Sequence, residues 1–302
     1  MATTNESTAP TSSPAFIPIE PFRSAKGADI ILRSSDGVDF HAHRVVLSLV
    51  SPVFETMFQL PQSGDAIDEI PVIDMEENSS TLQKALRFFY PGTHPDIQTL
   101  ADLEELVEVL ISKYDMQCLL PTVKQQFEKY YASNYLALYA LGVKHSWKDV
   151  AVEAAKASLK YRLRSLHTSE APPQLNGITA VAYHNLQHYH YLCGRAAQAT
   201  AHNPPWSGNG APCTHCRCVN ICVSDQSWKT MSFWMGDFLD QIGPALAEIP
   251  GLNIYEHSAF HQAIQKSLCT ATSCSGLNFF RSFAKVLIAQ IHTEIDKIEL
   301  KF

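Results

Sequence analysis

Residues 28–54 read ADIILRSSDGVDFHAHRVVLSLVSPVF and set the fold of the first part of the chain. Ala28 to Arg33 is rich in β-branched residues, and Val38 to His41 is a second short run that favours a strand. Between them, Ser34-Ser35-Asp36-Gly37 supplies the side chains of a tight turn. The pattern therefore predicts a β-hairpin. A helix is expected to begin at Ser51-Pro52, because Ser caps free amides and Pro fits the first helical position.

The pattern of strands and helices continues downstream. Ile70 to Met75 predicts a third strand, and a helix capped near Ser79 is expected to stop at Pro91-Gly92. Two more helices are expected over residues 102–116 and 119–131. This mixture of short strands and helices is typical of an α+β domain.

Composition and periodicity divide the chain into three parts. Residues 1–20 are rich in Thr, Ser and Pro and are expected to be a disordered N-terminal tail. Residues 21–132 are expected to form the α+β domain, and residues 133–302 an all-helical C-terminal region with a Cys-rich irregular segment at 201–229. The helices expected in this region cover about 133–143, 147–164, 179–200, 230–248, 256–268 and 278–300.

Charge and hydropathy exclude several classes of protein. The 302 residues are 46% hydrophobic with a net charge of −7, which indicates a folded protein and not a nucleic-acid-binding one. Residues 1–132 hold 9 Lys/Arg and 19 Asp/Glu, a net of −10, whereas residues 133–302 hold 14 and 11, a net of +3. No signal peptide or apolar run long enough to span a membrane is apparent. The protein is therefore expected to be intracellular, in the cytoplasm or the nucleus, with reduced thiols.

Several short motifs follow one another in the first half. They are Ala28-Asp29-Ile30-Ile31-Leu32, Phe40-His41-Ala42-His43-Arg44-Val45-Val46-Leu47, Ser51-Pro52-Val53-Phe54, Ile70-Pro71-Val72-Ile73-Asp74, Leu86-Arg87-Phe88-Phe89-Tyr90-Pro91-Gly92 and Ser112-Lys113-Tyr114-Asp115-Met116. In this order they resemble a BTB/POZ domain. The second half is similar to the helical extension of a large fungal group of BTB proteins.

The resemblance implies a small mixed sheet flanked by helices that binds other proteins and does not catalyse. The expected function is that of a non-enzymatic protein–protein interaction module. The domain would associate with its own copy or with other BTB proteins, and the chain would act as a scaffold or adaptor. Asp29 and Arg44 match the charged pair of the family near its dimer groove. A hairpin Asp opposed to an Arg two strands away would suit a partly buried ion pair. The alternative is that the pair only fixes the hairpin against the next helix.

Two other functions stay open at this stage. One is a substrate adaptor for a cullin-type ubiquitin ligase, although Leu60-Pro61-Gln62 lacks the Glu that cullin-binding relatives often carry there. The other is a zinc-containing, transcription-related regulator, which the acidic charge disfavours. No phosphate loop, nucleophile elbow or HExxH motif occurs, so neither an enzyme nor a small-molecule substrate is expected.

The cysteines predict a metal site. Cys213 and Cys216 form a CxxC pair, and Cys269 and Cys274 form a second short-spaced pair. Four thiolates from two such pairs are the ligands of a structural zinc ion. His215, Cys218 and Cys222 are competing ligands, and scattered free or buried thiols are the alternative.

Histidines cluster in the helix expected over 179–200. His184 and His188 share one face at a spacing of four residues, and His190 follows. Asn185 stands where a metalloprotease motif would place Glu. Because tyrosines alternate with these histidines, the segment is expected to be an aromatic packing surface.

Overall fold

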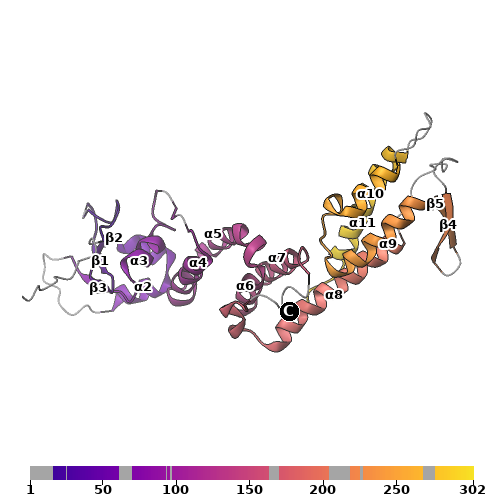
Figure 1. The fold of residues 1–302 in the computed structure, drawn as a ribbon. Coiled ribbons are helices and arrows are strands. Elements are labelled where there is room, and N and C mark those ends of the chain that lie inside the picture. The colour runs from indigo at the N-terminus through magenta and orange to yellow at the C-terminus, as the bar shows by residue number, and fades with distance from the viewer. Residues whose placement is uncertain are drawn as a thin grey trace, which may run out of the picture. The chain divides into compact units, whose positions relative to one another are not determined.

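A computed structural model describes residues 16–24, 26–60, 70–92, 94–95, 97–162, 170–203, 218–224, 227–267 and 276–302 (Figure 1). The chain forms two compact units, Met1–Lys129 and Tyr130–Phe302. Residues 1–15 of the predicted disordered tail lie outside the described residues.

The first unit contains the predicted three-stranded sheet, in the order β2-β1-β3. Strand β1 (Ile30–Arg33) pairs antiparallel with β2 (Asp39–Ala42) and parallel with β3 (Val72–Asp74). Ile30 and Leu32 of β1 are fully buried, as are the residues opposite them in β2, so one face of the hairpin enters the core. The expected mixed sheet is confirmed.

Short helices surround this sheet. They are α1 (Arg44–Val50), α2 (Pro52–Gln59), α3 (Ser79–Leu86), α4 (Leu100–Val107) and α5 (Leu120–Gln126), with a π-helical turn at Glu108–Lys113 and 3₁₀ turns at Gln117–Leu119 and Phe127–Tyr130. The helix predicted over 102–116 is thus α4 followed by the π-helical turn. Helix α1 was not predicted, because the β-branched Val45 and Val46 have low helix propensity.

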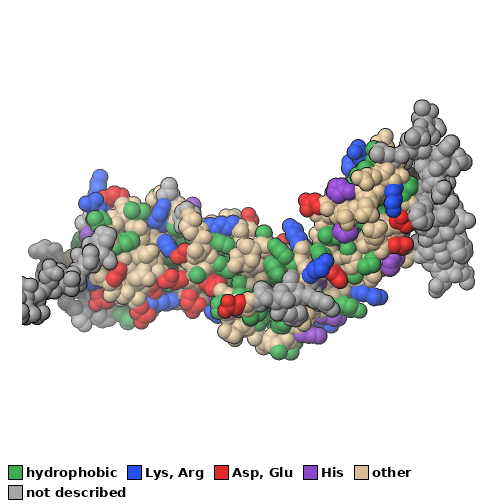
Figure 2. All heavy atoms as spheres, in the orientation of Figure 1, with side chains coloured by type: hydrophobic (Ala, Val, Ile, Leu, Met, Phe, Trp, Pro, Cys, Tyr) green, Lys and Arg blue, Asp and Glu red, His purple; other side chains and the backbone are tan. Residues whose placement is uncertain are grey.

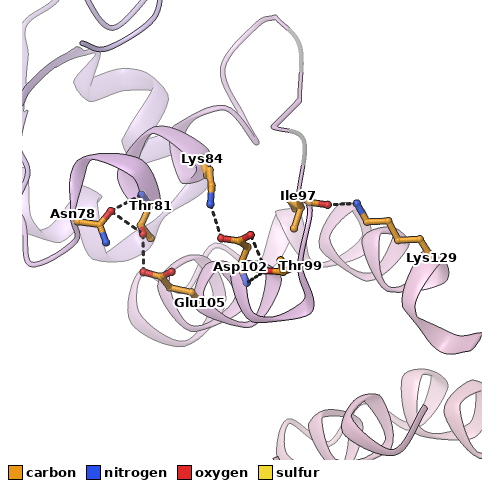
Figure 3. Close-up of polar contacts among 8 residues, drawn as sticks. All are labelled: Asn78, Thr81, Lys84, Ile97, Thr99, Asp102, Glu105 and Lys129. Atoms are coloured by element: carbon orange, nitrogen blue, oxygen red, sulfur yellow. Dashed lines mark hydrogen bonds and ion pairs between the residues drawn. The ribbon is translucent and has the colours of Figure 1, made fainter. Parts of the chain in front are cut away.

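Polar side chains join α3 to α4 (Figure 3). Thr81 donates to a carboxylate oxygen of Glu105 at 2.6 Å, and Lys84 pairs with Asp102 at 2.6 Å. Asn78 caps α3 and Thr99 caps α4 by accepting from backbone amides of the first turn. These contacts fix α3, and therefore the chain segment that follows it, against the rest of the unit.

The second unit is mainly helical, as predicted. Its helices are α6 (Tyr131–Lys144), α7 (Lys148–Ser158), α8 (Ala180–His202), α9 (Phe233–Glu248), α10 (Ser258–Ser267) and α11 (Gly276–Asp296), with 3₁₀ turns at Pro173–Gly177 and Ile254–Glu256. Helices α9, α10 and α11 meet at an aromatic cluster, in which the Phe280 ring lies 5.1 Å from Phe238 and 5.2 Å from Phe260. None of the helices in the described residues has the length and apolar composition needed to span a membrane.

One element corrects the all-helical prediction for this region. Strand β4 (Cys218–Ser224) pairs antiparallel with β5 (Ser227–Ser232), which leads directly into α9. Val219, Ile221 and Val223 alternate along β4, and β-branched residues at this spacing favour a strand. The Pro, Gly and Cys residues nearby outweighed this short signal in the sequence.

Helices α8 and α9 approach closely at Gly194. A Cβ atom built on Gly194 would lie far inside van der Waals contact with the carbonyl oxygen of Ala247 in α9. The obstacle is a backbone atom, so a rotamer change cannot relieve the clash. Glycine is therefore required here by packing, although it weakens a helix interior.

We expect Gly194→Ala to lower the free energy of unfolding by about 1–3 kcal/mol, the usual cost of overpacking. Alanine has about 1 kcal/mol better helix propensity, and this gain is too small to offset a clash with the backbone. Gly177→Ala is the matched control, because only the flexible Lys144 side chain lies near its new Cβ, at 3.8 Å. Chemical denaturation measures both. A Gly194→Ala protein as stable as the control would contradict the close approach.

His190 on α8 is a buried titratable group of the same unit. Its Nε2 lies 2.9 Å from the backbone oxygen of Tyr161, and because a carbonyl only accepts, Nε2 carries the proton. Burial lowers the pKa of His190 below its ordinary value of 6.5, and the hydrogen bond to Tyr161 opposes this shift only in part. The folded protein therefore keeps this ring neutral.

This pKa shift predicts a loss of stability in acid. Below pH 6.5 the unfolded chain takes up a proton that the folded chain does not, so the free energy of unfolding falls as the pH decreases. His190→Gln retains a donor for Tyr161 but cannot titrate. Between about pH 7.5 and about pH 5 the wild type is expected to lose more stability than this variant. Equal losses in the two proteins would contradict the prediction.

Candidate functional site

The beginning of α1 is held by two side chains that are distant in sequence. The carboxylate of Asp29 accepts from the backbone N–H of Arg44 at 2.7 Å, and the Tyr90 hydroxyl accepts from the N–H of His43 at 2.8 Å. The N-cap residue of α1, His43, makes no capping bond with its own side chain. Asp29 and Tyr90 thus satisfy amides that the helix leaves free.

The location of these two side chains follows from the elements around them. The N–H of Asp29 donates to Ala42 at 3.2 Å, so its carboxylate lies where the chain leaves β2. Tyr90 follows α3, and its ring packs edge-on against Phe22 at 5.0 Å. Burial raises the pKa of Tyr90 to about 12, so its hydroxyl remains protonated at neutral pH.

The Arg44 side chain lies against an aromatic ring. Its guanidinium lies over the ring of Phe58, 5.6 Å from the centroid, in a cation–π contact. Its Nε is buried and has no hydrogen-bond partner among the described residues. In that part of the chain no ion pair joins the side chains of Asp29 and Arg44; the link runs from the Asp29 carboxylate to the Arg44 backbone. This arrangement is the alternative in which the pair fixes the hairpin against the next helix.

Helix α1 presents two aliphatic side chains to solvent. Val45 is 64% exposed and Leu49 is 79% exposed, and their spacing of four residues places them on one face. Leu47, between them, points into the core. Leu60, at the end of α2, is also exposed. We call Val45 and Leu49 the α1 apolar pair.

A polar network, most of it buried, fixes α2 within the unit. Glu77, which is nearly buried, accepts from Lys113 at 2.7 Å and from the Tyr114 hydroxyl at 3.0 Å. The Ser51 hydroxyl, which caps α2, donates to the Tyr114 carbonyl at 2.6 Å. Tyr114 also stacks on Phe54 of α2, with centroids 4.7 Å apart. The network therefore connects α2 to the π-helical turn.

The charges in this network stabilise one another. Partial burial disfavours the charge of Lys113, but hydrogen bonds to Glu76 and Glu77 outweigh it and raise its pKa above the ordinary range. Burial, with the nearby Glu77 charge, raises the pKa of the Tyr114 hydroxyl as well. Lys113 is therefore cationic and Tyr114 neutral at physiological pH, and the network is fully hydrogen-bonded in that state.

Comparison with known families agrees with this geometry. The family model for the BTB/POZ domain matches residues 19–131. This part of the chain is a BTB/POZ domain. BTB/POZ domains are protein–protein interaction modules, so the partners that this domain implies are proteins. Lys113 and Tyr114, within the Ser112–Met116 motif, and Tyr90 hold the BTB domain together.

The predicted zinc ligands lie outside the described residues. Cys213, Cys216, Cys269 and Cys274 all fall in segments 204–217 and 268–275, so the zinc site stays a prediction. Within the described part of the chain, Cys118 is an exposed free thiol and Cys193 a buried one. No group of three or more metal-ligating side chains gathers among the residues that the structure describes.

The sequence alone did not single out the α1 apolar pair. In the sequence, each of Val45, Val46 and Leu47 looks like a core residue, because all three are aliphatic. A helical assignment for residues 44–50 would have separated Leu47 from Val45 and Leu49 by their spacing.

Removing the Asp29 carboxylate tests its capping role. Asp29→Ala leaves the Arg44 amide without its acceptor, and we expect it to lower the free energy of unfolding by about 1 kcal/mol. Asp29→Asn keeps an oxygen at the same place and is expected to cost clearly less. Urea denaturation of the two variants measures the difference. If Asp29→Asn lost as much stability as Asp29→Ala, the negative charge of Asp29, and not its role as a hydrogen-bond acceptor for α1, would be what stabilises the domain.

Proposed function

We propose that this BTB domain associates with a second BTB domain, either its own copy or another protein, through the face of α1. The observation that carries the proposal is the α1 apolar pair, Val45 and Leu49, on a helix whose start is fixed by Asp29 and Tyr90. A fixed apolar face loses little conformational entropy on docking. The role of the chain is therefore that of a scaffold or adaptor, in which the helical unit is carried by an oligomerising domain.

The energetics favour this face as the centre of a contact. Fully burying one Val or Leu side chain contributes about 1.5–3 kcal/mol. Arg44 adjoins the pair in sequence, and its guanidinium lies over the Phe58 ring, so the face carries a positive charge that suits an acidic group of a partner. Arginine is enriched at the well-packed centre of interfaces, and the aliphatic pair beside it would exclude water.

Charge distinguishes a second copy from a different partner. Residues 1–132 carry a net charge of −10, and Figure 2 shows acidic side chains on the surface of this unit. Two copies repel each other at low salt, so their association is expected to strengthen as salt screens the charge. A basic partner would show the opposite salt dependence.

Val45→Glu tests the proposed face in the full chain. Burial of a charge in place of valine is expected to weaken self-association by about tenfold or more, as measured by sedimentation velocity over a concentration series. Leu49→Glu is expected to do the same.

Val181→Glu is the matched control, since Val181 is equally exposed, at 67%, and is likewise the second residue of its helix, α8. A wild-type chain that remains monomeric at every concentration and salt level would refute association between copies, and self-association that is unchanged in Val45→Glu would refute the α1 face. A partner BTB protein that still bound Val45→Glu would refute the α1 face itself.

The cullin adaptor alternative gains no support from the described residues. The segment that follows α2, residues 61–69, lies outside them, and Leu60-Pro61-Gln62 has no Glu. Association between BTB domains is therefore the function that we carry forward.

A further inference from the structure

Helix α8 has two faces of different character. Its inner face carries Tyr189, His190 and Cys193, which are buried. Its outer face carries Val181, His184, His188 and Tyr191, and Figure 2 shows histidine side chains at the surface of this helical unit. Only part of the predicted aromatic–histidine packing surface is thus in the core. The outer histidines need a different explanation.

His184 and His188 form a stacked pair one helical turn apart. Their ring centroids are 6.0 Å apart and their planes differ by 11°. His184 is exposed and His188 is half-buried. Neither ring has a hydrogen-bond partner in the part of the chain that the structure describes. His190, by contrast, bonds to Tyr161, and His257 accepts from the Ala259 amide.

Two imidazoles in this arrangement are suited to chelating one metal ion. Neutral imidazole binds Zn²⁺, Cu²⁺ and Ni²⁺ through a ring nitrogen, at about 2.0–2.1 Å for Zn²⁺. Mg²⁺ and Ca²⁺ prefer oxygen ligands and bind imidazole poorly. Side chains four residues apart on a helix lie about 5–6 Å apart at Cβ, which lets two rings turn toward a common ion. A helix of 23 residues keeps this spacing rigid.

We propose that His184 and His188 bind a divalent transition-metal ion, such as Zn²⁺, on the outer face of α8. The protein supplies two ligands, because no third His, Cys, Asp or Glu side chain joins them among the described residues, and water completes the coordination. Asn185 stands where a hydrolytic site would place a general base, so the site binds a metal without a catalytic group beside it.

The site is independent of the BTB domain and of the predicted cysteine site. It lies in the second unit, on residues that the α1 face does not include. The cysteines are identical in wild type and in histidine variants, so any zinc that they bind cancels in a comparison. The failure of one proposal therefore leaves the others untouched.

The experiment compares zinc binding by the full chain and its variants. Each protein is dialysed to equilibrium against Zn²⁺ under reducing conditions, and bound zinc is counted by elemental analysis. Wild type is expected to hold one more zinc ion per chain than His184→Gln/His188→Gln. His202→Gln, an exposed histidine farther along α8, is the matched control and is expected to bind as wild type does.

A second measurement guards against a folding artefact. Because the ion binds the folded helix, Zn²⁺ is expected to raise the Tm of wild type more than that of the double variant. The two proteins should unfold alike in EDTA. If half-buried His188 affects folding, the single variant at exposed His184 is decisive and should also lose the ion. Equal zinc content in wild type and His184→Gln would overturn the proposal.

Discussion

The proposed interaction face of the BTB domain depends on how the first amides of α1 are satisfied. A helix of seven residues is too short to be stable by itself in water. Asp29 and Tyr90 accept its opening N–H groups, and they belong to the start of β1 and to the segment after α3. The helix therefore depends for its stability on the hairpin and on the segment after α3. Val45 and Leu49 are presented to solvent as a consequence of that assembly.

Several residues that resemble family motifs are structural in this chain. Tyr90 and Tyr114 are both nearly buried, and each makes a hydrogen bond that joins two segments. Lys113 neutralises Glu77 inside the domain. The buried residues of these motifs thus explain why the domain folds, and exposed residues such as Val45 and Leu49 are the ones available to a partner. Under the proposed function, binding specificity is expected to vary through these two positions.

Much of the fold followed from sequence patterns, and the exceptions have physical causes. The helices of the second unit were predicted because their apolar periods are long, and the hairpin because turn residues separate two β-branched runs. The β4–β5 hairpin was missed, since its strands lie beside Pro-, Gly- and Cys-rich sequence that is typical of irregular structure. Asp29 bonds to the backbone of Arg44, and a side chain that bonds to the backbone cannot be told from an ion pair by residue type. The outward direction of His184 and His188 required the helix to be placed against its neighbours.

The π-helical turn at Glu108–Lys113 makes the domain tolerant of a change in chain length at this place. Tyr114 donates its N–H to the carbonyl of Val109, five residues earlier, so this turn holds one residue more than an α-helix would. Deleting one residue early in this turn would restore ordinary α-helical spacing and leave the later side chains pointing in about the same directions. A residue lost from α4 would instead rotate Lys113 and Tyr114 by about 100° away from Glu77, leaving a buried carboxylate without its partners. Homologues are therefore expected to lose a residue in this turn more readily than in α4.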